Sequence, residues 1–277
     1  MPESASHPFV LILGMHRSGT SCLAGCLQAC GLHLGDVSRR GRFNAKGNRE
    51  SSDVWMLHDR ILGLNKAAWH RPADQVVVHP TYARQIQDII SDLSSAGCPA
   101  GVKDPRTLLL SDHWRSAVGN RCRLVGTFRH PLSVAKSLSV RDGLTTEQGL
   151  QLWIEYNSRL ADLHREAPFP LVKYEPGSFR EYCAAVISAA QTIGLNVSAS
   201  GVRRFVSRDL DHHHAQQTDV PADCRSLYDY LQTAARDCQQ LSPAVKRPSW
   251  LKTSARRLRR LFVQSVQLPP NTEFSDS

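Results

Sequence analysis

The 277-residue sequence has no apolar run that approaches the roughly 20 residues needed to cross a bilayer. Its N-terminus, MPESASHP, has neither the basic start nor the long apolar stretch of a secretory leader. Its eight cysteines show no CxxC pair and no compact disulfide framework. We therefore expect a cytoplasmic protein with reduced thiols.

Three of the cysteines, Cys22, Cys26 and Cys30, recur every four residues, which is the spacing of a buried stripe on a helix. The same spacing raises an iron–sulfur cluster as an alternative, but the thiolate ligands of such clusters usually lie on loops. We interpret these cysteines as small buried apolar residues.

The formal net charge of +9 is placed unevenly along the chain. Residues 246–277 hold seven Lys and Arg against two acidic residues, a surplus of five. The rest is mildly basic, which fits a polyanionic ligand and does not require nucleic acid. With 41% hydrophobic residues the chain can build a packed core. We predict one domain over 1–245 and a basic tail over 246–277.

A phosphate-binding loop without its usual lysine follows the first apolar run, Phe9–Leu13. The loop reads GMHRSGTS and leads into apolar positions at helical spacing. Gly14 and Gly19 match the two glycines of a GxxxxGK[ST] loop, but Thr20 replaces the lysine that a nucleotide kinase needs. The cation is Arg17 instead, which can fork onto oxyanions. Strand, glycine-bounded turn and helix N-terminus together predict a phosphate or sulfate site.

Strand and helix patterns alternate along the chain. Strands are predicted at 9–13, 100–103, 123–128 and 169–173. Helices are predicted at 20–30, 53–64, 80–96, 131–140, 145–165, 179–193 and 223–241, with a short one within 108–118. This alternation predicts an α/β fold, a parallel sheet with helices on both faces. The polar stretch 32–49 is predicted to be a long active-site loop.

Charged residues follow the ends of three predicted strands. They read Met15-His16-Arg17, Asp104-Pro105-Arg106 and Arg129-His130-Pro131. Ligands of parallel α/β sheets bind beyond the carboxyl ends of the strands. We therefore expect one cationic crevice at this edge, formed by Arg17, Lys103, Arg106 and Arg129.

With these motifs in view, the chain resembles the sulfotransferase family, which uses 3′-phosphoadenosine 5′-phosphosulfate. The cation-Ser-Gly-Thr-Ser core of the family's 5′-phosphosulfate loop corresponds to Arg17–Ser21. An arginine at a strand end with a serine eight residues later corresponds to Arg129 and Ser137. The bacterial branch is the most similar, through GMHRSGTS, Asn44-Ala45-Lys46-Gly47 with Glu50, and Lys103-Asp104-Pro105-Arg106. The resemblance spans 9–175 and implies a P-loop NTPase-like sulfotransferase fold.

The resemblance also implies residue roles. The 5′-phosphosulfate would be held by His16, Arg17, Ser18, Gly19, Thr20 and Ser21, and the 3′-phosphate by Arg129 and Ser137. Glu50 would be the general base, Lys103 would touch the sulfuryl or acceptor oxygen, and Arg17 would stabilise the transition state. A sulfuryl group carries less negative charge than a phosphoryl group, so no metal is expected. The acceptor would be a hydroxyl of a carbohydrate, a glycolipid or a natural product.

Other interpretations stay open at this point. Glu50 could favour the following helix as a first-turn acid, and Asp59 and His58 are alternative bases. Lys103 and Asp104 could simply pair, and Arg129 could be a surface charge. The protein could also be a P-loop small-molecule kinase, or a catalytically degenerate nucleotide-binding protein.

The C-terminal part differs from many cytosolic members of that family. Their Arg-Lys-Gly segment is missing here, and Arg203, Arg204 or Arg208 could replace it. The run His212–His214 cannot direct all three rings at one ion from a regular element, so we expect a polar loop and no zinc site. The tail 246–277 could contact an anionic membrane surface or dock on the domain. The oligomeric state cannot be read from the sequence.

Overall fold

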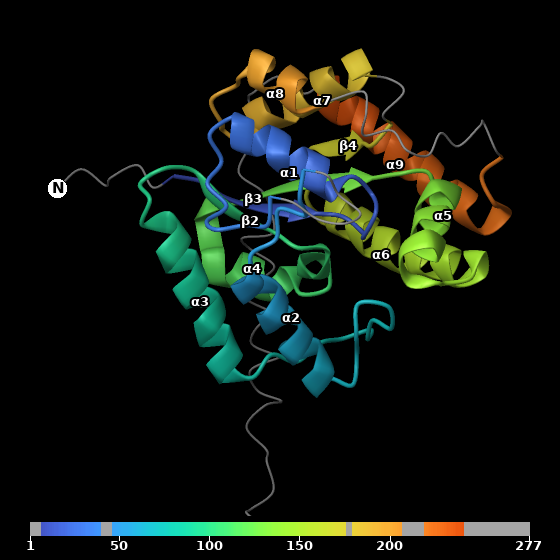
Figure 1. Ribbon diagram of the computed structural model, residues 1–277, viewed down its shortest axis with the longest axis horizontal. Helices are drawn as coiled ribbons and strands as arrows, with labels where there is room; N and C mark the ends of the chain where they lie inside the picture. The colour runs from blue at the N-terminus through green and yellow to red at the C-terminus, as the bar shows by residue number, and fades with distance from the viewer. Residues whose placement is uncertain (1–6, 40–45, 176–178, 207–218, 241–277) are drawn as a thin grey trace, which may run out of the picture. The chain divides into compact units, whose positions relative to one another are not determined.

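Four short apolar segments form one parallel sheet in the computed structural model, which describes residues 7–39, 46–175, 179–206 and 219–240. The strands are β1 (Phe9–Leu13), β2 (Ala100–Lys103), β3 (Cys122–Phe128) and β4 (Leu171–Lys173). Their spatial order in the described residues is β2-β1-β3-β4, and every pairing is parallel. The predicted α/β fold with a parallel sheet between helices is confirmed (Figure 1).

The strand boundaries differ from the predicted ones at two places. β3 begins at Cys122, which pairs with Phe9, one residue earlier than predicted. β4 begins at Leu171 and not at Phe169. Proline has no N–H to give to a strand ladder, so Pro170 contributes only its carbonyl oxygen, which accepts from the Gly126 N–H at 2.9 Å.

Helices cover both faces of the sheet (Figure 1). On one face, Val10 and Ile12 share a core with α1 (Thr20–Ala29), α7 (Phe179–Thr192) and α8 (Ala199–Phe205). On the other face lies α6 (Thr146–Glu166). A Cβ on Gly126 would press into Leu160 of α6 and Leu171. Gly126 therefore allows α6 to approach the sheet closely.

The remaining helices pack along the edge strands, on α6 or on one another. They are α2 (Ser52–Leu64), α3 (Pro80–Ser94), α4 (Ser111–Val118), α5 (Pro131–Asp142) and α9 (Ala222–Gln240), with 3-10 turns η1 (Pro105–Leu108) and η2 (Gly119–Arg121). The helix predicted within 108–118 is thus preceded by a 3-10 turn, because Asp104 accepts from the Arg106 N–H and caps it. Thr145 caps α6 through a reciprocal capping box with Gln148.

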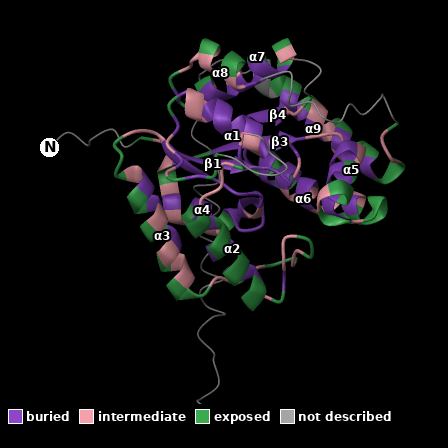
Figure 2. Ribbon diagram, in the orientation of Figure 1, coloured by how far each residue is buried: buried purple, intermediate pink, exposed green. Residues whose placement is uncertain are grey.

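Burial follows the sheet (Figure 2). Every residue of β1 is fully buried, as expected for a central parallel strand. Cys22, Cys26 and Cys30 are buried free thiols, which confirms the predicted stripe on α1. Among the described helices, none has both the length and the apolar character needed to span a bilayer.

Candidate active site

The loop after β1 is shaped by glycines and tied to β3. Gly14 and Gly19 both have positive φ, and so does Arg17 (64°). A Cβ on Gly14 would clash with the Thr127 carbonyl oxygen. The Thr127 hydroxyl donates to the Ser18 carbonyl oxygen at 3.1 Å, which fixes the loop on the neighbouring strand. Gly19 begins α1 without a side-chain cap, so the first N–H groups of the helix face the predicted anion site.

Arg17 connects this loop to α5. Its Nε donates to Ser137 Oγ at 2.7 Å, across 120 residues of sequence. Burial lowers the pKa of Arg17, and the charges of Arg141 and Arg129 lower it further against a smaller opposing effect of Asp142. We call Arg17, Arg129 and Arg141 the arginine cluster. Partly buried like charges repel one another, and a bound polyanion would relieve that repulsion.

Arg129 lies at the end of β3, beside Tyr174 at the end of β4. The guanidinium carbon of Arg129 is 5.3 Å from the centroid of the Tyr174 ring. The Trp153 indole donates to the Arg129 carbonyl oxygen at 2.9 Å and fixes this backbone. A Cβ on Gly19 would enter the Tyr174 ring, so the ring lies directly against the loop. Tyr174 thus joins the loop to the arginine cluster.

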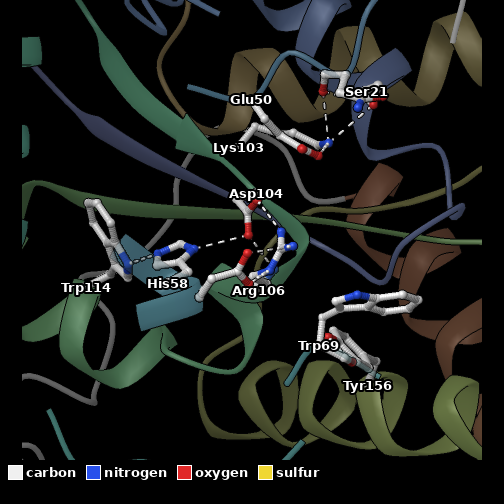
Figure 3. A network of polar contacts seen from close by, with 11 residues as sticks. Ser21, Glu50, His58, Trp69, Lys103, Asp104, Arg106, Trp114 and Tyr156 are labelled. Atoms are coloured by element: carbon white, nitrogen blue, oxygen red, sulfur yellow. Dashed lines mark hydrogen bonds and ion pairs between the residues drawn. The ribbon is translucent and has the colours of Figure 1, made fainter. Parts of the chain in front are cut away.

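Lys103 holds Glu50 at the end of β2 (Figure 3). Its ammonium donates to Glu50 Oε1 (2.6 Å), to the Asn48 carbonyl oxygen (2.9 Å) and to Ser21 Oγ (3.3 Å). The Lys103 side chain is 2% exposed and the Glu50 side chain 18%. An ammonium has three donors, and here all three point at protein acceptors. Lys103 therefore ties α1, the segment before α2 and β2 together around one carboxylate.

The neighbouring Asp104 is fully buried between His58 and Arg106 (Figure 3). The Trp114 indole can only donate, so His58 Nε2 accepts its N–H (2.8 Å) and the histidine proton sits on Nδ1. Nδ1 donates to Asp104 Oδ1 at 3.1 Å, and the Arg106 guanidinium donates to Oδ2 at 3.0 Å. Burial alone would raise the pKa of Asp104, but the His58 hydrogen bond and the Arg106 charge leave it below its usual range.

These contacts count against His58 and Asp59 as the general base. His58 is buried, and its one lone pair accepts from Trp114, so no ring nitrogen is left for a substrate proton. Asp59 forms an ion pair with Arg106, with 2.7 Å between Oδ1 and Nε. Burial lowers the pKa of Arg106, but Asp104 and Asp59 more than offset it and raise it overall. Lys103 and Arg106, together with the three carboxylates that face them, form what we call the paired cluster; the carboxylates are Glu50, Asp59 and Asp104.

The predicted crevice of four cations is therefore corrected. Arg17 and Arg129 do lie together, but carboxylates neutralise Lys103 and Arg106. The third member of the arginine cluster, Arg141, was not predicted. A signal existed in its spacing, because Arg141 lies four residues after Ser137 and hence on the same face of α5.

A third group of side chains surrounds His16, directly before Arg17. The His16 ring lies 4.6 Å from the Trp69 ring and 6.2 Å from Tyr156, centroid to centroid. The Tyr156 hydroxyl donates to the Trp69 carbonyl oxygen at 2.8 Å, and the Arg141 guanidinium lies over the indole at 5.1 Å. Burial, followed by the charges of Arg141, Arg106 and Lys103, lowers the pKa of His16 well below its usual value.

Several predictions fall on residues outside the described ones. They concern Asn44, Ala45, Arg208, His212–His214, the domain boundary at 245 and the tail 246–277, and they stay predictions. Arg203 and Arg204 are described, in the last turn of α8. There, Lys46 donates to the Phe205 carbonyl oxygen, and Arg49 lies over the Phe205 ring at 5.2 Å. In the described residues, no three His, Cys, Asp or Glu side chains are grouped so that they could hold a metal.

Comparisons with known proteins give a similarity in structure but not in sequence. No protein-family profile and no curated protein sequence matches the chain. Among solved structures, it is similar to the sulfotransferase domain of the Synechococcus PCC 7002 olefin synthase. That similarity covers 97% of this chain and 99% of the other, at 16% sequence identity and a TM-score of 0.47.

Proposed function

We propose that this protein is a sulfotransferase, which moves a sulfuryl group from 3′-phosphoadenosine 5′-phosphosulfate to a hydroxyl of a carbohydrate, glycolipid or natural product. The observation that carries the proposal is the 2.7 Å contact between Arg17 and Ser137. It joins the two motifs on which the family resemblance depends, although they lie 120 residues apart in sequence. A kinase function would explain the loop, but it would leave Arg129 and Ser137 without a role.

The residues around the loop fit a donor with two anionic ends. The arginine cluster supplies the positive charge, and burial with like-charge repulsion already lowers the pKa of Arg17. The Ser18 hydroxyl is buried and has no hydrogen-bond partner in the described structure. We assign the 5′-phosphosulfate to Arg17, Ser18, Gly19, Thr20 and Ser21, and the 3′-phosphate to Arg129 with Ser137. When bound, the donor supplies an activated sulfuryl group.

Glu50 takes the proton of the acceptor hydroxyl in this mechanism. Lys103 holds Oε1 at 2.6 Å, which orients the carboxylate and leaves Oε2 for the proton. All three Lys103 donors are engaged, so we assign Lys103 as a positioning residue for Glu50 in place of the predicted contact with the sulfuryl oxygen. Arg17 and the N–H groups at the start of α1 stabilise the negative charge that develops on the leaving phosphate oxygen. No metal is needed in this scheme.

Ligand-dependent thermal stability is the first test. At about a hundred times its Kd, 3′,5′-ADP should raise Tm by about 5–10 °C, with little effect of 5′-ADP. A larger shift with ATP and magnesium would support the kinase instead. Transfer of labelled sulfate to any of a panel of hydroxyl acceptors then separates an enzyme from a catalytically degenerate binding protein. Selective 3′,5′-ADP binding without transfer to any acceptor would favour the degenerate form.

A further inference from the structure

His16 has a ring nitrogen that the described structure leaves without a partner. The side chain is 7% exposed, and its Nε2 atom is buried with no hydrogen bond. A buried polar atom of this kind costs free energy unless something pairs with it. His16 directly precedes Arg17, and the charges of Lys103 and Arg106 act on its ring, so we place a partner for Nε2 at the same edge of the sheet as the proposed sulfuryl site.

The charges around His16 favour a neutral partner. Arg141 of α5 and Lys103 and Arg106 at the end of β2 all disfavour the imidazolium form, and only Asp104 favours it. A histidine that served to bind the anionic donor would gain from being charged. Here burial and three cations keep the ring neutral, so it adds no positive charge to the anion site. A neutral imidazole has one nitrogen that donates and one that accepts, and the accepting nitrogen can bind a hydroxyl.

The side chains packed on His16 are aromatic. Trp69 is only partly buried, and it contacts both the His16 ring at 4.6 Å and the Arg141 guanidinium at 5.1 Å. Its backbone is fixed, since the Tyr156 hydroxyl donates to the Trp69 carbonyl oxygen at 2.8 Å. A turn of the indole about its side-chain bonds would leave this backbone contact in place.

We propose that His16 binds the acceptor and not the donor, and that its Nε2 accepts a hydrogen bond from a second hydroxyl next to the one that receives the sulfuryl group. The proposal rests on the proposed function. A reacting hydroxyl has one proton, which Glu50 takes, so the group that satisfies His16 must be another donor on the same molecule. Trp69 turns aside and packs against the apolar face of the acceptor. The acceptor class is a vicinal diol, as a sugar ring carries.

Two small probes test this directly, trans-cyclohexane-1,2-diol and cyclohexanol, each offered with labelled donor. The wild-type protein should prefer the diol by about tenfold or more in kcat/KM, the value of one good hydrogen bond. His16→Phe keeps a ring against Trp69 but removes the nitrogen, so the preference should vanish while 3′,5′-ADP still raises Tm. His16→Gln places an amide near the Nε2 position and should restore part of the preference.

A control and a second readout keep the test decisive. His70 is exposed and its ring also contacts Trp69, at 5.3 Å, so His70→Gln should leave the diol preference unchanged. In protein labelled with ¹⁵N-histidine and saturated with 3′,5′-ADP, the diol should shift the His16 Nε2 resonance and cyclohexanol should not. An equal preference in wild type and His16→Phe, or no shift with the diol, overturns the inference. If the wild-type protein does not bind 3′,5′-ADP, the proposed function itself is wrong.

Discussion

The two halves of the carboxyl edge of the sheet contain similar numbers of cations but balance them differently. In the paired cluster, at the end of β2, Lys103 faces Glu50 and Arg106 faces Asp59 and Asp104. In the arginine cluster, around the β1 loop and α5, burial lowers the pKa of Arg17 most, and the neighbouring positive charges lower it further. The two halves lie side by side, since β2 pairs directly with β1.

This difference in charge distinguishes a structural cluster, at the end of β2, from a ligand site, at the arginine cluster. In a largely buried ion network every cation already has a carboxylate partner, so no anionic ligand is needed, and removal of one partner leaves an uncompensated charge. A cluster with surplus positive charge is less stable alone and is stabilised when an anion binds. We therefore expect substitutions in the paired cluster to change folding stability, and substitutions in the arginine cluster to change ligand affinity. Glu50 is part of the cluster around Lys103 and Arg106 by its contacts, and it is also the proposed general base.

Glu50→Gln should have the largest effect. It keeps the size of the side chain and an oxygen for Lys103, but removes the group that takes the proton. We expect kcat to fall by about 10²–10⁴-fold, the usual share of a general base. The Tm shift with 3′,5′-ADP should stay at the wild-type value. A rate within twofold of wild type in the labelled-sulfate assay would remove Glu50 from the mechanism and leave it as a partner of Lys103.

Asp104→Ala should have the second largest effect, which is a loss of folding stability. It would leave His58 Nδ1–H and the Arg106 guanidinium without their buried acceptor. We expect a loss of about 3–5 kcal/mol in the free energy of unfolding, measured by urea denaturation. The matched control is Asp162→Ala, which breaks an exposed pair with Arg165 and should change stability by less than about 1 kcal/mol. Equal losses for the two variants would contradict the comparison between buried and exposed pairs.

The same carboxyl group predicts how stability depends on pH. Asp104 has a pKa below its usual range in the folded protein, so folding favours its charged form. Its contribution is complete above the ordinary carboxyl pKa of about 3.9, and it is lost as the pH falls below that value toward the folded pKa. Urea midpoints between pH 5 and pH 2 should fall steeply for wild type and less steeply for Asp104→Asn. Parallel curves would show that Asp104 does not carry the acid sensitivity.

Sequence patterns predicted the frame of this site because local chemistry determines it. The apolar run Phe9–Leu13, the glycines of the next loop and Pro131 at a helix start are each readable from a few neighbouring residues. The loop and the Arg129 motif were also expected at one edge, since parallel strands end together. What remained open was which cation faces which carboxylate. No sequence spacing indicates that Asp59, the eighth residue of α2, turns toward Arg106.

The missed residues are those that tertiary packing brings in from irregular segments. Trp69 lies between α2 and α3 in a stretch without periodicity, so nothing local indicates that it reaches His16. Tyr174 gave a usable signal, because it directly follows a strand that ends at the same edge. The hydrogen bond that occupies His58 Nε2 comes from Trp114, 56 residues away, which only the folded structure reveals.

A matched pair of arginine variants would sharpen the comparison between the two halves. Arg129→Gln should weaken 3′,5′-ADP binding by about 10–100-fold, as loss of a charged phosphate contact does. Its unfolding free energy without ligand should be unchanged or slightly raised, because repulsion at Arg17 decreases. Arg106→Gln should do the reverse, with lower stability and a similar affinity. Calorimetric titration and urea denaturation measure both, and the same outcome for both variants would contradict the division.

Ser137→Ala should have the smallest effect and tests the contact between the two motifs. The substitution removes the oxygen that accepts from Arg17 Nε but keeps all charges in place. The loss in unfolding free energy without ligand should be about 1 kcal/mol or less, the net value of one hydrogen bond. The affinity for 3′,5′-ADP should fall by less than about tenfold, clearly less than in Arg129→Gln. Ser133→Ala, on the same helix and also buried, is the matched control and should leave that affinity unchanged. A loss of affinity as large as that of Arg129→Gln would mean that Ser137 contributes as much to 3′-phosphate binding as Arg129 does, and that its contact with Arg17 belongs only to the unliganded protein.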